Sequence, residues 1–331
     1  MSKKKSFAIF NGRELMVMGI IVAMTVIFSI LSSTFRSYPT LVSVLDSTYY
    51  VSLMAIGVTF PLITGGVDLS IGTGLVCYSL IGGYLAVNKG MPIIVALLIT
   101  ILVGVVIGIL NGCLVALMDL PPFLATLCTC MITRGLGPAL CGGFGVSWPS
   151  ALSADGWFRR IFKFTNASGR VIPIGIILIV VIVLIMSFVL NHTKVGRYTI
   201  AIGSNKEATR LAGVNVKFYH VTAYAICGLF AGLAGVAYAA TYATIYPGTG
   251  AGFEMDAIGG AIVGGVSASG GSGTIFGAFL GVIVISLMKI GLPFVGLQAN
   301  WQQIFTGLVL LGAVLIDIEK KKINCFNEPM T

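Results

Sequence analysis

Long apolar stretches separated by short polar segments dominate this chain. A helix that crosses a membrane needs about 20 mostly apolar residues, and ten stretches approach or exceed that length. They cover residues 15–33, 48–64, 71–88, 93–118, 122–142, 171–190, 218–240, 256–267, 273–291 and 301–318. The eighth stretch is short and rich in glycine, and only a GGVDLS sequence separates the second from the third. The pattern predicts an all-α polytopic membrane protein with about ten transmembrane segments.

The composition excludes a soluble protein. Hydrophobic residues make up 57% of the 331 residues and charged residues only 9%, with a net charge of +9. A soluble domain carries about 25% charged residues. The lysines and arginines gather in the tails and in two loops, which is typical of residues that set membrane topology beside anionic lipid. The seven cysteines show no CxxC spacing. We therefore expect lipid as a partner, and no nucleic acid, metal or cofactor.

A Gly-rich motif occurs twice, 199 positions apart. Gly65–Gly74 reads GGVDLSIGTG and Gly264–Gly273 reads GGVSASGGSG, with six of ten positions identical. Apolar segments interrupted by glycine at matching positions of two halves are typical of transporters built from repeats. Chance recurrence among 43 glycines is the weaker explanation, because the Val and a Ser also match in register. We predict one transmembrane domain over residues 1–331, with two related halves and Gly-rich broken helices. Candidates for the helix breaks and the translocation path are Gly65, Gly66, Asp68, Ser70, Gly264, Gly265 and Ser267.

The distribution of charge predicts the orientation in the membrane. Basic residues in the tails 1–14 and 319–331 favour the cytoplasm for both termini, which agrees with an even number of spans. The basic loops 144–170 and 191–217 are separated by one predicted helix and must lie on opposite sides. Their charges are too similar to decide between them, and the span count places 191–217 in the cytoplasm. The first stretch is a transmembrane helix rather than a signal peptide, since no small-residue cleavage site follows it.

Within the inner loop, the segment from Ser204 to Gly213 has the sequence of a short capped helix. Ser204 or Asn205 can cap its start, Glu207 suits the positive helix end, and Gly213 suits the closing turn. Ala208, Leu211 and Ala212 fall on one side of it. The segment is either a docking element for a partner protein or a helix resting on lipid. The candidate coupling residues are Asn205, Glu207, Ala208, Arg210, Leu211 and Gly213.

Three carboxylates fall within or beside apolar sequence. An ionisable group at membrane depth costs about 2.5–3.5 kcal/mol on insertion scales and is a candidate functional residue. Asp68 follows two glycines, so it is either a structural N-cap of the next helix or part of a gate or substrate path. Its counterpart Ser267 is also a good N-cap, which favours capping. Glu254 and Asp256 are either helix N-terminal charges or groups that line the path, and their spacing does not separate these two roles.

The chain has no pattern of an enzyme. It contains no GxxxxGK[ST] phosphate loop, and its two histidines do not form a nucleophile triad with an acid and a serine. A transporter driven by ATP would therefore need its ATPase on another polypeptide.

Four blocks of sequence resemble the membrane permeases of bacterial ATP-binding-cassette importers for ribose and other monosaccharides. The blocks are AIGVTFPLITGGVDLSIGTGL, PPFLATL, GRY with AIGSNKEATRLAGVNV, and FEMDAIGGAIVGGVSASGGSGTIFGAFLG. Branched-chain amino acid permeases are more distant kin. The resemblance implies a multi-pass protein of the bacterial inner membrane, working with a second permease copy or paralogue, with ATPase subunits, and with an extracytoplasmic sugar-binding protein. It also implies that the loop around Ser204–Val216 contacts the ATPase. The alternative is a secondary transporter of a small polar solute, driven by an ion gradient.

Overall fold

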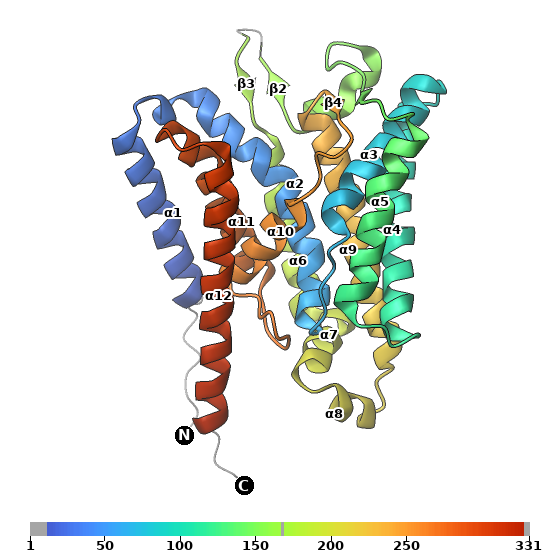
Figure 1. Cartoon of the computed structure of the whole chain (residues 1–331), viewed down its shortest axis with the longest axis vertical. Coiled ribbons are helices and arrows are strands. Elements are labelled where there is room, and N and C mark those ends of the chain that lie inside the picture. Colours follow the sequence, from blue (N-terminus) through green and yellow to red (C-terminus); the bar gives the residue numbers. More distant parts are fainter. Residues whose placement is uncertain (1–11, 167–168, 328–331) are drawn as a thin grey trace.

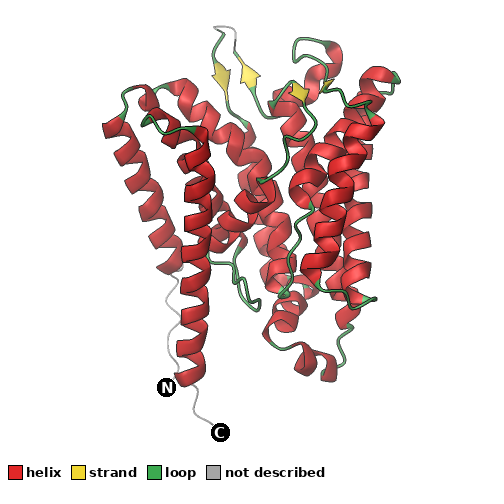
Figure 2. Cartoon of the chain, in the orientation of Figure 1, coloured by secondary structure: helices red, strands yellow, loops and turns green. Residues whose placement is uncertain are grey.

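The fold is almost entirely helical, as the apolar pattern predicts (Figures 1 and 2). The computed structural model describes residues 12–166 and 169–327. The helices that match the predicted stretches are α1 (Gly12–Leu31), α2 (Tyr38–Ile63), α3 (Ile71–Asn88), α4 (Ile93–Ala116), α5 (Pro122–Leu140), α6 (Gly175–His192), α9 (Val216–Thr241), α10 (Phe253–Val263), α11 (Ile275–Phe294) and α12 (Ala299–Asn327). Eight helices in the described residues are long and apolar enough to cross a membrane. The 11-residue α10 is too short, which agrees with the short eighth stretch.

Two helix boundaries differ from the prediction. α2 begins at Tyr38, ten residues before the predicted start, because its first turns carry Ser43, Asp46 and Ser47 and so lack an apolar signature. α12 continues to Asn327, so that residues 319–327 of the predicted C-terminal tail are helical. Residues 1–11 and 328–331, the remainder of the two predicted tails, lie outside the described residues.

Short elements occupy the two ends of the molecule. Helices α7 (Lys194–Ser204) and α8 (Lys206–Leu211) form one end, with Gly12 and Asn327 on the same side (Figure 1). The opposite end carries the 3₁₀ helices Thr34–Arg36 and Ala154–Ile161. It also carries two antiparallel strand pairs, β1 (Val146–Ser147) with β4 (Thr244–Ile245) and β2 (Phe164–Thr165) with β3 (Val171–Ile172). We call these the α8 end and the β2–β3 end. The two basic loops therefore lie at opposite ends, as the single predicted helix between them requires.

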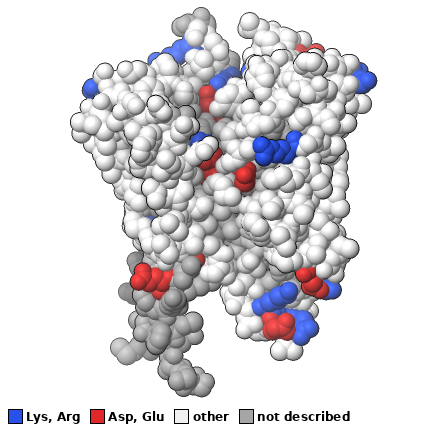
Figure 3. Space-filling model, in the orientation of Figure 1, with Lys and Arg blue, Asp and Glu red and all other residues white. Residues whose placement is uncertain are grey.

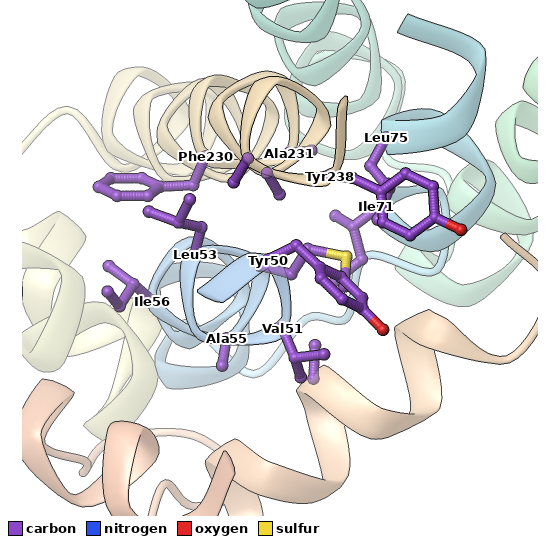
Figure 4. Close-up of a cluster of buried hydrophobic side chains, with 14 of the residues drawn as sticks. Tyr50, Val51, Leu53, Ala55, Ile56, Ile71, Leu75, Phe230, Ala231 and Tyr238 are labelled. Atoms are coloured by element: carbon purple, nitrogen blue, oxygen red, sulfur yellow. The ribbon is translucent and has the colours of Figure 1, made fainter. Parts of the chain in front are cut away.

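Helix α2 is the centre of the hydrophobic core. Every residue from Thr48 to Ile63 is buried, so this part of the helix has no lipid-facing side. Figure 4 shows Leu53 of α2 directed toward Phe230 of α9, and Ile71 and Leu75 of α3 beside Tyr238 of α9. Helices α9, α10 and α11 also pack on α2, which buries it from all sides. α2 thus connects the early part of the chain with the late part.

Glycines allow α4 and α9 to pack closely. Gly104, Gly108 and Gly112 recur every four residues on α4; the first two face Gly228 of α9, and Gly112 faces Val221. A Cβ atom on Gly108 would overlap the backbone oxygen of Tyr224. Small residues at this spacing allow two backbones to touch, and packing of this kind holds helices together where lipid removes the hydrophobic driving force.

We expect Gly108→Ala to destabilise the fold by about 1–3 kcal/mol, the usual cost of overpacking, because the new methyl group meets backbone that cannot rotate away. The measurement is the thermal midpoint and yield of monodisperse protein in detergent. Gly19→Ala is the matched control, because a Cβ there has nothing within 4 Å. An unchanged midpoint in Gly108→Ala would show that α4 and α9 do not pack this closely.

Candidate functional site

Both Gly-rich motifs end a helix in the same way. After α2, the N–H of Gly65 donates to Leu62 O and that of Gly66 to Pro61 O, both at 2.9 Å. Gly65 has a φ of +82°, a conformation that glycine adopts without strain. This pair of bonds is a Schellman motif, which satisfies the last carbonyls of a helix. The break after α2 therefore leaves its helix end without exposed polar backbone.

The break after α10 repeats this geometry one residue out of register with the sequence motif. There the N–H of Gly265 donates to Ile262 O and that of Val266 to Ala261 O, both at 2.9 Å, and Gly265 has a φ of +99°. Gly65 therefore matches Gly265 in structure, whereas the sequence alignment paired it with Gly264. The second break is also longer, since it spans 264–274 against 64–70 in the first.

The two breaks contact each other directly. The N–H of Gly271 donates to Ile63 O, at the end of α2, at 2.8 Å. Gly203 of α7 lies against the same carbonyl and against Gly271, and a Cβ at position 203 would overlap both. The ends of α2 and α7 and the loop 264–274 thus form one junction near the α8 end.

The prediction that Ser267 caps a helix equivalent to the one after Asp68 is wrong. The N-cap of α11 is Thr274, whose Oγ1 accepts the N–H of Gly277 at 3.0 Å. Ser267 instead donates from its hydroxyl to Asp317 Oδ2 of α12 at 2.8 Å. The longer second break moves the cap seven residues further along the chain.

Asp68 lies in the non-helical segment between α2 and α3 and is fully buried. Its Oδ1 accepts the N–H of Ser70 at 2.9 Å and the Ser70 hydroxyl at 2.6 Å. The amide of Asn111, on α4, donates to both carboxylate oxygens at 3.3 and 3.4 Å and to the Ser70 hydroxyl at 2.9 Å. A carboxylate buried away from water needs such donors. Asp68 therefore ties the break to α4.

The position of Asp68 differs by two residues from a standard N-cap. The N-cap residue of α3 is Ser70, which makes no side-chain capping bond of its own. Asp68, two residues before it, instead accepts the N–H of Ser70 itself. The backbone of the same segment is held by α5 and α9, because Val67 O accepts the hydroxyls of Thr126 at 3.3 Å and Tyr224 at 3.4 Å. A non-helical segment is stable at membrane depth only when protein groups satisfy it in this way.

Charged side chains form a band down the middle of one face (Figure 3). The band runs from the β2–β3 end to about mid-height, on a surface that is otherwise uncharged there. Two ion pairs join charged side chains of this part of the molecule: Lys163 with Asp46, and Lys289 Nζ with Asp256 Oδ2, the latter at 2.6 Å. Arg134 of α5 is exposed and lines a small hollow. We call the two ion pairs, Arg134 and Glu254 together the charged groove.

The structure separates the roles of Glu254 and Asp256. Glu254 accepts the N–H of Gly252 at 3.1 and 3.2 Å, so its carboxylate satisfies the backbone at the start of α10. It also lies directly against Gly72 of α3, where a Cβ would overlap its oxygens. Asp256 is 4% exposed and pairs with Lys289 of α11. Glu254 is a helix-terminal charge and Asp256 is half of an ion pair between two helices.

Comparison with known proteins identifies the family. Residues 40–314 match the family described as "Branched-chain amino acid transport system / permease component". The chain is 33% identical to the ribose import permease RbsC of Escherichia coli K12 over 304 residues, which cover 89% of this chain and 90% of that protein. It is 30% identical to the fructose import permease FrcC of Rhizobium meliloti, with 89% and 82% covered. It is 34% identical to the autoinducer 2 import permease LsrC of Salmonella typhi, with 93% and 86% covered.

This chain belongs to that permease family. It is a transport subunit and not an enzyme. No solved structure matches it.

At the α8 end of the permease, α8 has the predicted capping. Asn205 is its N-cap, because Asn205 Oδ1 accepts the N–H of Ala208 at 2.9 Å. Ser204 belongs to the end of α7, where its hydroxyl donates to Ile200 O. Gly213, with a φ of +82°, closes the turn after α8. Helix α7 itself was not predicted, because its mixture of basic, small and apolar residues reads as a loop.

The outer surface of α8 combines charge and an exposed apolar side chain. Glu207 and Arg210 form an ion pair of 2.7 Å, and both side chains are about two-thirds exposed. Leu211 is 83% exposed, while Thr209 is buried on the opposite side of the helix. α8 therefore presents one ion pair and one large apolar side chain at the end of the molecule.

Sequence reasoning missed two residues of the permease site. Lys289 is the only charged residue in the stretch 273–291, so the rule that flagged Asp68 could also have found it. Asn111 carried no comparable signal, since a single amide in an apolar helix gives no indication of its partner. The bond from Asn111 to Asp68 joins residues 43 positions apart.

We predict that Asp68→Asn retains most folded permease, because Asn also accepts a hydrogen bond from the Ser70 N–H. Asp68→Leu leaves buried donors on Ser70 and Asn111 unsatisfied, at about 1–3 kcal/mol each, and reduces the yield of folded protein. Yield and thermal midpoint in detergent are the measurements. Asp155→Leu, at an exposed carboxylate of the β2–β3 end, is the control. If Asp68→Asn assembles normally but abolishes transport, the charge itself acts in the gate or the path.

Proposed function

We propose that this permease forms the translocation path of an ATP-driven importer for a monosaccharide or a related small polar solute. The relatives named above import ribose, fructose and autoinducer 2, which are small and rich in oxygen. The observation that carries the proposal in this chain is the charged groove. Nothing in the comparisons favours the secondary transporter considered above.

The charged groove is a poor surface to expose to lipid. Charged groups at membrane depth are costly and mark substrate pathways in membrane proteins. Arg134 and the Lys289–Asp256 pair lie on membrane-spanning or membrane-buried helices. We therefore assign this face to the path, closed by a second permease copy or a paralogue. A polar solute entering at the β2–β3 end would meet hydrogen-bonding groups instead of hydrocarbon.

The α8 end is proposed to be cytoplasmic, and with it both chain termini. The basic residues of the tails 1–14 and 319–331 support this orientation under the positive-inside rule, since α1 begins and α12 ends at the α8 end. The β2–β3 end would then face the extracytoplasmic binding protein that delivers the solute. In this orientation α8 points its exposed Leu211 toward the compartment that contains ATP.

The junction of the breaks gives a route from the ATPase to the path. A partner bound at α8 would act on α7, and Gly203 of α7 lies against Ile63 and Gly271. The break after α2 leads directly to Asp68 and α3. We propose that ATP-driven movement of the ATPases shifts α7 and α8 as a rigid body and alternates the access of the path.

The first prediction is that transport requires the ATPase. Proteoliposomes with the permease, the ATPase and the loaded binding protein are expected to take up ribose or fructose when supplied with ATP. Proteoliposomes with the permease alone are expected to take up none, because the chain has no phosphate loop. Uptake by the permease alone, driven by a sodium or proton gradient, would contradict the proposal.

The second prediction concerns docking. Leu211→Asp or Ala208→Asp places a charge in the proposed contact. Each is expected to weaken co-purification of the ATPase by ~10-fold or more, because losing one anchoring side chain of an interface costs about 1.4 kcal/mol of binding free energy or more. Leu152→Asp is the matched control, since Leu152 is 93% exposed at the β2–β3 end. Normal co-purification and transport in both α8 variants would show that α8 is not the contact.

A further inference from the structure

A hollow lies at the outer mouth of the charged groove. It has a volume of about 340 Å³ and lies between α2, α11 and α12, near the β2–β3 end. The residues that matter most in its lining are Ser47, Tyr50, Tyr242, Lys289 and Gln302. Sites for small molecules begin at about 300 Å³ and combine apolar walls with a few polar groups. The size and the lining of this hollow therefore suit a monosaccharide.

Aromatic rings form one wall of the hollow. The ring of Tyr50 lies 6.1 Å from that of Tyr242 and 5.2 Å from that of Phe253, and Tyr238 packs on both tyrosines. Tyr50 is 4% exposed and held in place by these contacts, whereas Tyr242 is 39% exposed and presents surface to the hollow. An aromatic ring has an apolar face, and tyrosine adds a polar hydroxyl. Such a wall suits a solute with C–H faces and hydroxyl groups.

The polar wall carries a charge that is already compensated. Lys289 Nζ lies 2.6 Å from Asp256 Oδ2 and 5.5 Å from the centre of the Phe253 ring. An ammonium group has three N–H donors, and Asp256 is the hydrogen-bond acceptor recorded for Lys289 among the described residues. Lys289 and Gln302 both line the hollow and bring N–H donors to its wall. Because Asp256 neutralises the lysine, the wall offers hydrogen bonds without a net charge.

We infer that this hollow is a binding subsite of the permease itself for an uncharged polyhydroxyl solute, which it holds before the path opens. The inference deepens the proposed function and rests on it. A zwitterionic amino acid is disfavoured, because the ion pair that would have to recognise its ends is closed on itself. The hollow lies near the β2–β3 end, where we propose that the solute enters. Through Lys289 it adjoins the ion pair with Asp256 that links α10 and α11.

The test measures binding to the full permease in lipid nanodiscs, without ATPase or binding protein. D-ribose, D-fructose and L-leucine are titrated by saturation-transfer NMR. We expect saturable binding of at least one sugar and none of leucine. Tyr242→Ala should weaken sugar binding by roughly 3- to 10-fold, the value of one aromatic contact. Gln302→Leu, which leaves the aromatic cluster intact, should weaken it as well.

Tyr246→Ala is the matched control. Tyr246 lies four residues after Tyr242 and is 59% exposed, and it does not line the hollow. Equal weakening by Tyr246→Ala, no saturable sugar binding, or saturation by leucine alone would overturn the subsite. ATP-driven sugar uptake by the complete importer separates the two proposals. If uptake occurs, and neither Tyr242→Ala nor Gln302→Leu changes its KM, then the subsite is wrong and the importer function stands. If uptake of every sugar fails, the proposed function fails.

Discussion

The need to satisfy backbone polar groups inside a membrane governs this structure. An unbonded N–H or C=O in hydrocarbon costs several kcal/mol, so irregular backbone is tolerated only where protein supplies its partners. Both interrupted helices obey this constraint locally through Schellman turns. Beyond those turns they depend on each other, because Gly271 donates to the terminal carbonyl of α2. Neither interruption is complete without the other, although their sequences lie about 200 residues apart.

More of the fold than of the site could be predicted from the sequence. Ten apolar stretches, a duplicated motif and the capping residues around Asn205 are all local signals, and the helices follow them. The register of the duplicated motif is different. Sequence identity paired Gly65 with Gly264, whereas hydrogen bonding pairs it with Gly265, because helix termination depends on which glycine reaches positive φ. Sequence identity aligns residues of the same type, whereas the backbone geometry of the break is set by where the preceding helix ends.

The site also shows which side chains a single sequence can reveal. Asp68 and Asp256 stand out because carboxylates are rare in apolar sequence, and Lys289 follows the same rule. Their partnerships are non-local. Asn111 bonds Asp68 across 43 residues and Lys289 bonds Asp256 across 33, and no periodicity encodes either pair. The roles of Glu254 and Asp256, inseparable by spacing, differ because one faces backbone N–H groups and the other faces an ammonium.

Gly203 has a consequence for building chimeric permeases. It is the point where α7 touches the end of α2 and the loop 264–274, and any side chain there would collide with backbone on both. If α8 recruits the ATPase as proposed, a segment containing α7 and α8 could be exchanged between relatives to change which ATPase binds, provided that this glycine is kept. An exchange that substitutes it would disturb both halves of the recipient at once. Exchange of segments in this protein is therefore limited by the need for a residue without a side chain at position 203.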